Sequence, residues 1–68
     1  MDRIKIGKKL SALRKERGET VFEVANAVGV CQGAVSMYET GARVPRDDIK
    51  RKLSKHFGVS IEEIFFAE

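Results

Sequence analysis

The segment Thr20–Glu39 constrains the fold of this chain more than any other, because it holds two apolar-striped helices joined at one glycine. In its first half, apolar residues recur at i, i+3, i+4 and i+7, which is one face of a helix: Val21, Val24, Ala25 and Val28. Gly29 follows them, and because glycine adopts positive φ without a steric penalty, we expect the first helix to end there. The second half has a narrower inward stripe of Val35 and Tyr38, with Ala34 beside it. The sequence therefore predicts a helix-turn-helix over about residues 20–40, a unit whose second helix fits the major groove of DNA.

The other face of the second helix is polar but almost uncharged. It is made of Gln32, Gly33, Ser36, Met37 and Thr40. A face that only meets water usually carries charged side chains, so this composition favours a contact surface. Ordinary solvated surface is the alternative interpretation for Gln32 and Ser36.

Three more helices are predicted around this unit. The first covers about residues 2–17, ends at Gly18 and has an inward stripe of Ile6, Leu10 and Leu13. The next is expected over about residues 45–56, with Pro45 in its first turn and an inward stripe of Ile49, Leu53 and Phe57. A last short helix follows Ser60 and carries Ile61, Ile64 and Phe65. No segment has strand periodicity, so we expect residues 1–68 to form one all-α domain of five short helices.

Several helix starts carry capping signals. Thr20 and Glu23 have the spacing of a capping box, in which each side chain bonds the backbone of the other residue. Ser60 and Glu63 repeat that spacing before the last helix. Asp47 and its neighbour Asp48 complement the positive end of the helix dipole.

Length and composition exclude several classes of protein. A chain of 68 residues allows one small core, and its 13 Lys and Arg against 10 Asp and Glu permit a nucleic-acid partner without requiring one. One cysteine and one histidine give neither a disulfide framework nor a usual metal-ligand set. No apolar run reaches the length of a membrane span or a signal sequence, so we expect a cytoplasmic protein. No nucleophile and base stand out either, and we expect no enzymatic activity and no cofactor.

The chain resembles the phage repressor and Cro-like regulators, the XRE family of helix-turn-helix proteins. The resemblance covers nearly the whole chain and rests on an ordered set of residues: Leu10, Leu13, Arg14, Gly18, Thr20, Val24, Ala25, Val28, Gly29, Val30, Val35, Ser36, Tyr38, Glu39, Gly41, Pro45, Phe57, Gly58, Val59, Ser60, Glu63 and Phe65. It implies a compact five-helix, lambda-repressor-like domain that binds double-stranded DNA as a homodimer, with half-sites about one turn of DNA apart.

The resemblance also implies roles for individual residues. Bases would be read by the start and exposed face of the second helix of the unit, here Gln32, Gly33, Ser36 and Met37. The DNA backbone would be contacted by Thr20, Thr40, Arg43 and Arg46, with Lys8 or Arg17 reaching it from the first helix. A local ion pair is the alternative role for Arg46. Arg14 and Glu39 match a buried ion pair that ties the first helix to the recognition helix.

Two residues depart from the family pattern. Val21 stands where many relatives have a glutamine that contacts a phosphate, which leaves the amides at the start of that helix as the anchor. Cys31 stands where relatives usually have a capping Ser or Thr. The simple interpretation is a substituted, weaker cap; the alternative is a thiol whose oxidation switches DNA binding.

Two phenylalanines lie off the predicted core stripes. Phe66 points away from the stripe that Phe65 completes, so we expect a dimer interface formed by Ile61, Ile64 and Phe66. Phe22 lies off the stripe of its own helix, and the sequence does not choose between the edge of the core and a partner contact.

The sequence thus favours a sequence-specific DNA-binding regulator, most simply a homodimeric repressor on a palindromic operator. The alternative is a protein-interaction module of the same fold, antitoxin-like or a partner-binding regulator. The two differ in the surface they use, since DNA would meet Gln32, Met37 and Arg43, and a protein would meet Phe22 or Phe66. RNA binding is less favoured, because the chain offers no aromatic platform for stacking bases.

Overall fold

Five helices follow one another in the computed structural model, which describes residues 2–66. They are α1 (Arg3–Glu16), α2 (Val21–Val28), α3 (Gln32–Thr40), α4 (Asp47–Phe57) and the π-helix η1 (Glu62–Phe66). The described residues contain no strand. The predicted all-α fold of five helices is therefore confirmed.

The helix-turn-helix has the ends that its sequence predicts. Thr20 Oγ1 accepts a hydrogen bond from the Glu23 amide at 3.1 Å, and Glu23 Oε1 accepts one from the Thr20 amide at 2.8 Å, which completes the capping box. Gly29 ends α2 in the left-handed region, with φ of 75°. Only three residues therefore separate the two helices.

Two predicted helix starts are wrong in detail. Pro45 precedes α4 instead of lying in its first turn, because Arg46 has ψ of 165°, which is extended backbone, and serves as the N-cap. Asp47 and Asp48 do occupy the first turn, as predicted. At the last helix only half of the expected capping box forms.

That half is the bond from the Glu63 amide to Ser60 Oγ, at 3.1 Å. The Glu63 carboxylate does not return to the Ser60 amide and instead lies 3.8 Å from Lys9 Nζ on α1. The segment then forms a π-helix, which the α-helical spacing of its apolar residues did not indicate.

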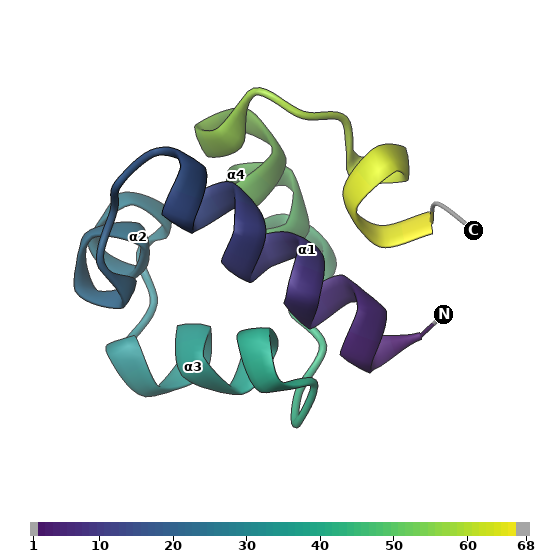
Figure 1. Cartoon of the computed structure of the whole chain (residues 1–68), viewed down its shortest axis with the longest axis horizontal. Helices are drawn as coiled ribbons and strands as arrows, with labels where there is room; N and C mark the ends of the chain where they lie inside the picture. The colour runs from purple at the N-terminus through teal and green to yellow at the C-terminus, as the bar shows by residue number, and fades with distance from the viewer. Residues whose placement is uncertain (1, 67–68) are drawn as a thin grey trace.

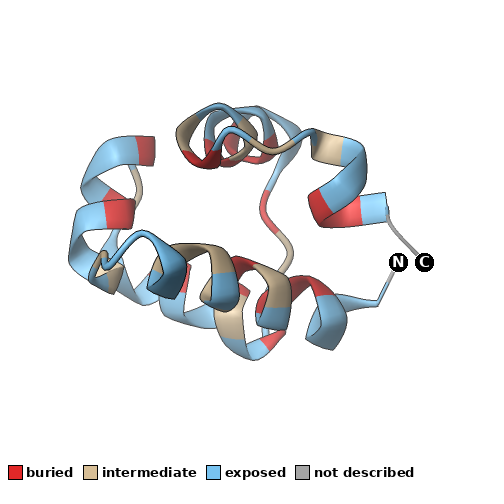
Figure 2. Ribbon diagram, turned by 45° about the horizontal axis from the view of Figure 1, so that its top comes forward, coloured by how far each residue is buried: buried red, intermediate tan, exposed pale blue. Residues whose placement is uncertain are grey.

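The helices enclose one core. In Figure 1, α1 crosses the middle of the molecule and α3 lies along one edge. α3 packs against α1 and α2, α2 also packs against α4, and η1 packs against α1. Buried residues face the interior (Figure 2), and the buried apolar set is Ile6, Leu10, Val24, Ala25, Val28, Ala34, Val35, Tyr38, Ile49, Leu53, Phe57, Ile64 and Phe65.

The predicted stripes supply nearly all of that set. Leu13 and Val21 are half-buried and pack against it from its border. Within residues 2–66, none of the helices has the length and apolar character needed to cross a membrane, and no three metal-ligating side chains cluster.

Candidate nucleic-acid interface

α3 has one buried face and one open face. Ala34, Val35 and Tyr38 are at most 6% exposed and fix the helix against the core. The open face is formed by Gln32, Gly33, Ser36, Met37 and Thr40, all exposed. Met37 is 44% exposed, a large apolar side chain left in contact with solvent. None of these five residues is charged, so the open face of α3 offers hydrogen bonds and apolar contacts and no fixed charge.

The start of α3 lacks a side-chain cap. Cys31 occupies the N-cap position with extended backbone, but it makes no capping hydrogen bond, and its side chain is exposed. The Ala34 amide donates to the Cys31 carbonyl at 3.1 Å, whereas no side-chain atom of the cap residue accepts from the amides of Gln32 and Gly33.

The four residues expected at the DNA backbone are all exposed: Thr20 at the start of α2, Thr40 at the end of α3, Arg43 after α3 and Arg46 before α4. The Thr40 hydroxyl donates to the Met37 carbonyl at 3.2 Å, and the Thr20 hydroxyl accepts the capping bond already described. The Thr20 hydroxyl thus keeps its hydrogen free to donate, whereas the Thr40 hydrogen is engaged and only the oxygen lone pairs of Thr40 are open. Arg43 follows α3 and Arg46 precedes α4, so both arginines belong to the connection after α3.

The basic residues expected to contact the DNA backbone differ in their pairing. Within residues 2–66, Arg43 and Arg46 make no ion pair, which contradicts the alternative of a local carboxylate partner for Arg46. Arg17 Nε, in contrast, lies 3.1 Å from Glu19 Oε1, so this side chain is engaged within the protein. Lys8 is exposed.

Arg14 joins α1 to the end of α3. Its Nε donates to Glu39 Oε2 at 2.7 Å and its Nη2 donates to Glu39 Oε1 at 3.1 Å, a two-bond contact between planar groups. The third nitrogen, Nη1, donates to the Glu19 carbonyl at 2.9 Å. The two charged side chains are 15% and 12% exposed. The hydrogen bond that Arg14 donates to Glu39 raises the pKa of Arg14 above its ordinary value, against the opposite effect of burial. Arg14 therefore holds α3 and the α1–α2 connection together.

A second polar cluster joins the same connection to α4. His56 Nε2 lies 3.0 Å from both carboxylate oxygens of Glu19, and Arg17 also approaches that carboxylate. Burial raises the pKa of Glu19, but the hydrogen bonds and charges of His56 and Arg17 outweigh burial, and the net pKa is lowered. Sequence reasoning missed this cluster. His56 and Glu19 are 37 residues apart, and no local pattern relates them.

Gly7 sets how closely α1 approaches α3. A Cβ atom at this position would overlap the Glu39 carbonyl oxygen and would lie 2.7 Å from the Tyr38 carbonyl oxygen. Glycine is therefore required in the middle of α1 because backbone atoms of α3 occupy the space of a side chain. The sequence shows Gly7 but carries no signal of what lies opposite it.

The residues expected at a dimer interface lie in different environments. Ile64 is 3% exposed and belongs to the core of its own chain, which corrects its assignment to a surface, since its side chain is enclosed by other helices. Ile61 is half-buried, and Phe66 is 56% exposed. Phe22 is also 56% exposed on the first turn of α2. Both phenylalanines are thus surface residues, as the position of Phe66 off its stripe predicts and as the sequence left open for Phe22.

Comparisons with known proteins agree with this architecture. A family model described as helix-turn-helix matches residues 10–64. The restriction-modification controller protein C.AhdI from Aeromonas hydrophila superposes with a TM-score of 0.87 and 26% identity, over 94% of this chain and 97% of that one. The clp gene regulator ClgR from C. glutamicum has a similar fold, with a TM-score of 0.83 and 24% identity over 97% of this chain and 86% of that one. No curated protein sequence matches significantly. The chain therefore belongs to the XRE-type helix-turn-helix family of DNA-binding transcriptional regulators.

Proposed function

We propose that this protein is a transcriptional repressor that binds a palindromic operator as a homodimer, with α3 in the major groove. The observation that carries the proposal is the open, uncharged face of α3, which the core and the Arg14–Glu39 pair hold in a fixed orientation. A DNA-binding domain can repress by occupying a promoter, because it then excludes the polymerase.

The chemistry of the open face suits base edges. The Gln32 amide can bond both N6 and N7 of adenine, and Met37 can pack against the methyl group of thymine. Ser36 can bond either a base edge or a phosphate. Gly33 adds no contact of its own and lets the helix backbone come close to the base pairs.

Residues around α3 have the character of phosphate ligands. Arg43 and Arg46 carry charges that no carboxylate of residues 2–66 neutralises. Thr20 adds a hydroxyl group with a free hydrogen at the start of α2, and Thr40 adds one at the end of α3 that can donate to a phosphate in exchange for its bond to the Met37 carbonyl. Contacts of this kind fix the position of a protein on DNA without selecting a sequence.

Phe66 and Ile61 are the residues we propose for the dimer contact. A two-fold dimer presents two recognition helices, and on B-DNA two such helices read half-sites about 34 Å apart. An operator bound in this way has the same two-fold symmetry as the protein.

Selection of bound duplexes from a random DNA pool tests the proposal directly. We expect a palindromic site with half-sites about one helical turn apart and an affinity at least about 10³ above that for random DNA. Gln32→Ala should relax the preference at one base pair of each half-site, at about 1–3 kcal/mol for each bidentate contact. Asn26→Ala, which removes an exposed amide from α2, is the matched control and should leave the selected site unchanged.

The outcome against the proposal is weak binding that does not depend on sequence. One observation favours the second candidate in that case: Phe22 leaves a large aromatic side chain exposed on α2. The fold would then serve as a protein-interaction module, and Phe22→Ala would abolish capture of the partner.

A further inference from the structure

Lys50 is the only charged residue among the buried side chains that the structure describes. Its side chain is 10% exposed, and its Nζ lies 5.6 Å from the ring centre of Phe65 and 5.4 Å from that of Phe66, within the range of cation–π contact. Its one carboxylate neighbour within residues 2–66 is Asp47, whose Oδ1 is 3.7 Å away, beyond hydrogen-bond distance. The Asp47 side chain is 87% exposed, so water screens the attraction. The ammonium group therefore lies beside two aromatic rings, without a hydrogen-bond partner among residues 2–66, at a point that solvent reaches.

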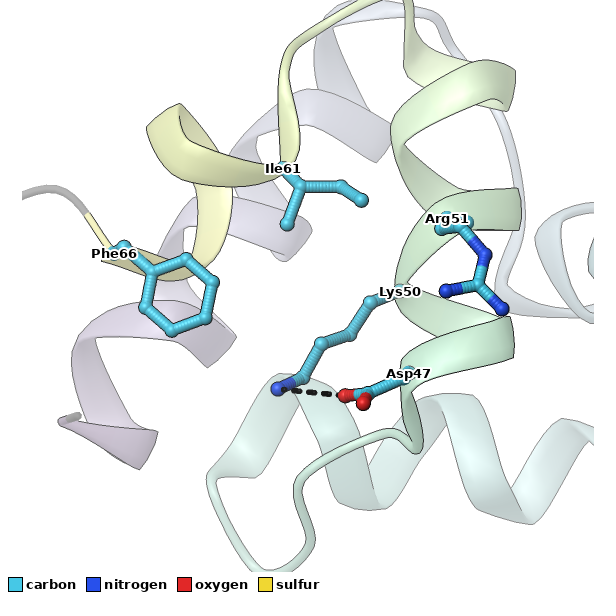
Figure 3. A pocket seen from close by; sticks show the side chains of 5 residues that line it. All are labelled: Asp47, Lys50, Arg51, Ile61 and Phe66. Atoms are coloured by element: carbon cyan, nitrogen blue, oxygen red, sulfur yellow. Dashed lines mark ion pairs between the residues drawn. The ribbon is translucent and has the colours of Figure 1, made fainter.

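A cavity of about 250 Å³ opens beside this ammonium group (Figure 3). Its lining is Asp47, Lys50, Arg51, Ile61 and Phe66. Two cationic side chains thus share the cavity with an aliphatic and an aromatic wall, and only one acid balances them. A carboxylate on a short aliphatic stem fits this lining, because the stem can lie against the apolar walls while the oxygens meet the cations. That is the chemistry of a glutamate side chain.

Glu62 supplies such a side chain on the same surface. It is exposed and makes no ion pair with any residue of 2–66. Glu62 lies four positions before Phe66, about one turn of η1, so the two side chains leave the helix on the same side. The exposed ring of Phe66 therefore has both an unpaired acid and a cationic cavity as neighbours.

We propose that the cavity of Lys50 and Arg51 receives Glu62 of the partner subunit, in a two-fold dimer centred on Phe66. In such an interface residue i meets residue j of the other copy and j meets i, so a patch that holds one acid and one cationic cavity is complementary to itself. Each dimer forms the contact twice. The inference rests on the homodimer proposed above, and it adds that ionic contacts select the partner and make assembly sensitive to salt.

Two charge reversals, alone and mixed, test the inference. Glu62→Lys places a cation opposite Lys50 and Arg51, and Arg51→Glu places an acid opposite Glu62 of the partner subunit. We expect each variant alone to dimerise about tenfold or more weakly than the unmodified chain in sedimentation equilibrium at low salt. A mixture of the two should regain dimers, because the cation of one variant then meets the acid of the other.

Glu63→Lys is the matched control. It makes the same change of charge one position along η1, where the side chain faces Lys9 of its own chain, and it should dimerise like the unmodified chain. Both reversed residues are exposed, and circular dichroism should show unchanged helix content in both variants.

Three results would overturn the inference. The first is a Glu62→Lys variant that dimerises as well as Glu63→Lys. The second is a mixture of variants that stays monomeric. The third is an effect of Arg51→Glu without any effect of Glu62→Lys, which would mean that the cavity takes an acid from another source. Titration of each variant on a single operator half-site keeps the proposed function separate, because a monomer with an intact α3 still prefers its own half-site over random DNA.

Discussion

Gly7 and Gly33 both lie inside helices, yet they have opposite surroundings. At Gly7 the backbone of α3 fills the place of a side chain, whereas at Gly33 no atom beyond the adjacent residues and the backbone of α3 itself lies within 4 Å of the position that a Cβ would take. Neither residue has positive φ. Glycine at position 7 is thus required by the fold, whereas at position 33 the fold gains nothing from it.

Alanine at each of the two positions should therefore have opposite effects. Gly33→Ala should raise the free energy of unfolding by up to about 1 kcal/mol, the usual gain of alanine over glycine in a helix. Gly7→Ala should lower it by about 1–3 kcal/mol, because α1 must move away from α3. Urea unfolding measures both values. If the proposed DNA contact is close, Gly33→Ala should also weaken operator binding although it stabilises the protein; tighter binding would contradict the role given to Gly33.

Arg14 is the residue whose loss should cost most. Removing it leaves the Glu39 carboxylate largely buried without its two hydrogen bonds, and we expect Arg14→Ala to lower stability by about 3 kcal/mol. Operator binding by Arg14→Ala should also decrease, because a smaller fraction of the protein is folded.

A double-mutant cycle separates the pair from its surroundings. Arg14→Ala combined with Glu39→Ala should cost clearly less than the sum of the two single changes, because the second change removes the charge that the first left unpaired. If the loss of stability in the double variant equalled the sum of the two single losses, Arg14 and Glu39 would not be coupled.

At the scale of the elements, the α1–α2 connection is held from two sides. Arg14 donates to the Glu19 carbonyl from α1, and His56 meets the Glu19 carboxylate from α4. A carboxylate only accepts, so His56 Nε2 carries the hydrogen that it donates. The connection thus links α4 to α1 and, through Glu39, to α3.

This link predicts a pH dependence of stability. The pKa of Glu19 is lower in the folded than in the unfolded protein, so the unfolded protein binds more protons in acid. The stabilising contribution of Glu19 is complete above its ordinary pKa and disappears as the pH falls through the lowered value. Glu19→Gln should therefore cost about 1–2 kcal/mol near pH 7 and almost nothing in strong acid. Thermal melts of the unmodified protein and of Glu19→Gln, from strong acid to pH 7, measure this difference in stability. If the difference in melting temperature did not change with pH, the Glu19 carboxylate would not stabilise the fold.

The start of α3 offers a stabilising change. Cys31 makes no capping bond, whereas a serine hydroxyl at an N-cap accepts one from the first turn. Cys31→Ser should raise the free energy of unfolding by about 0.5–1 kcal/mol. Cys31→Ala is the control, since it removes the thiol without adding a cap and should not stabilise. Equal melting temperatures for the two variants would show that the serine hydroxyl makes no capping hydrogen bond.

The sequence predicts most elements but fewer of the contacts between them. Apolar periodicity locates α1 to α4, and the resemblance to the XRE family supplies the partners Arg14 and Glu39. Neither the apolar periodicity nor the family resemblance predicts the contact between Glu19 and His56, because only the packing of α4 against α2 brings these two residues together. Lys50 resembles any other solvated lysine in the sequence, and its burial follows from the position of η1, which the sequence predicts only roughly.

For the whole molecule, the distribution of unpaired charge predicts how DNA binding responds to salt. Arg43 lies in the connection after α3 and has no partner within residues 2–66, so under the proposed function it is free to meet a phosphate. Arg43→Ala should weaken binding to operator and to random DNA alike. The slope of log K against log salt should flatten by about 0.9 for each phosphate that is no longer neutralised. Lys55→Ala removes the same charge from the last turn of α4 and should leave the slope unchanged. A weakening confined to the operator would instead assign Arg43 to base reading.

The division of α3 into two faces has a consequence for how such a protein can diversify. The residues that anchor the helix, Ala34, Val35, Tyr38 and Glu39, are separate from the exposed residues at positions 32, 33, 36 and 37. Exchanging only the exposed set would leave the core and the ion pair untouched. One scaffold could therefore be redirected to new operators by a handful of substitutions, either in the divergence of gene duplicates or in the laboratory, without being refolded around each new target.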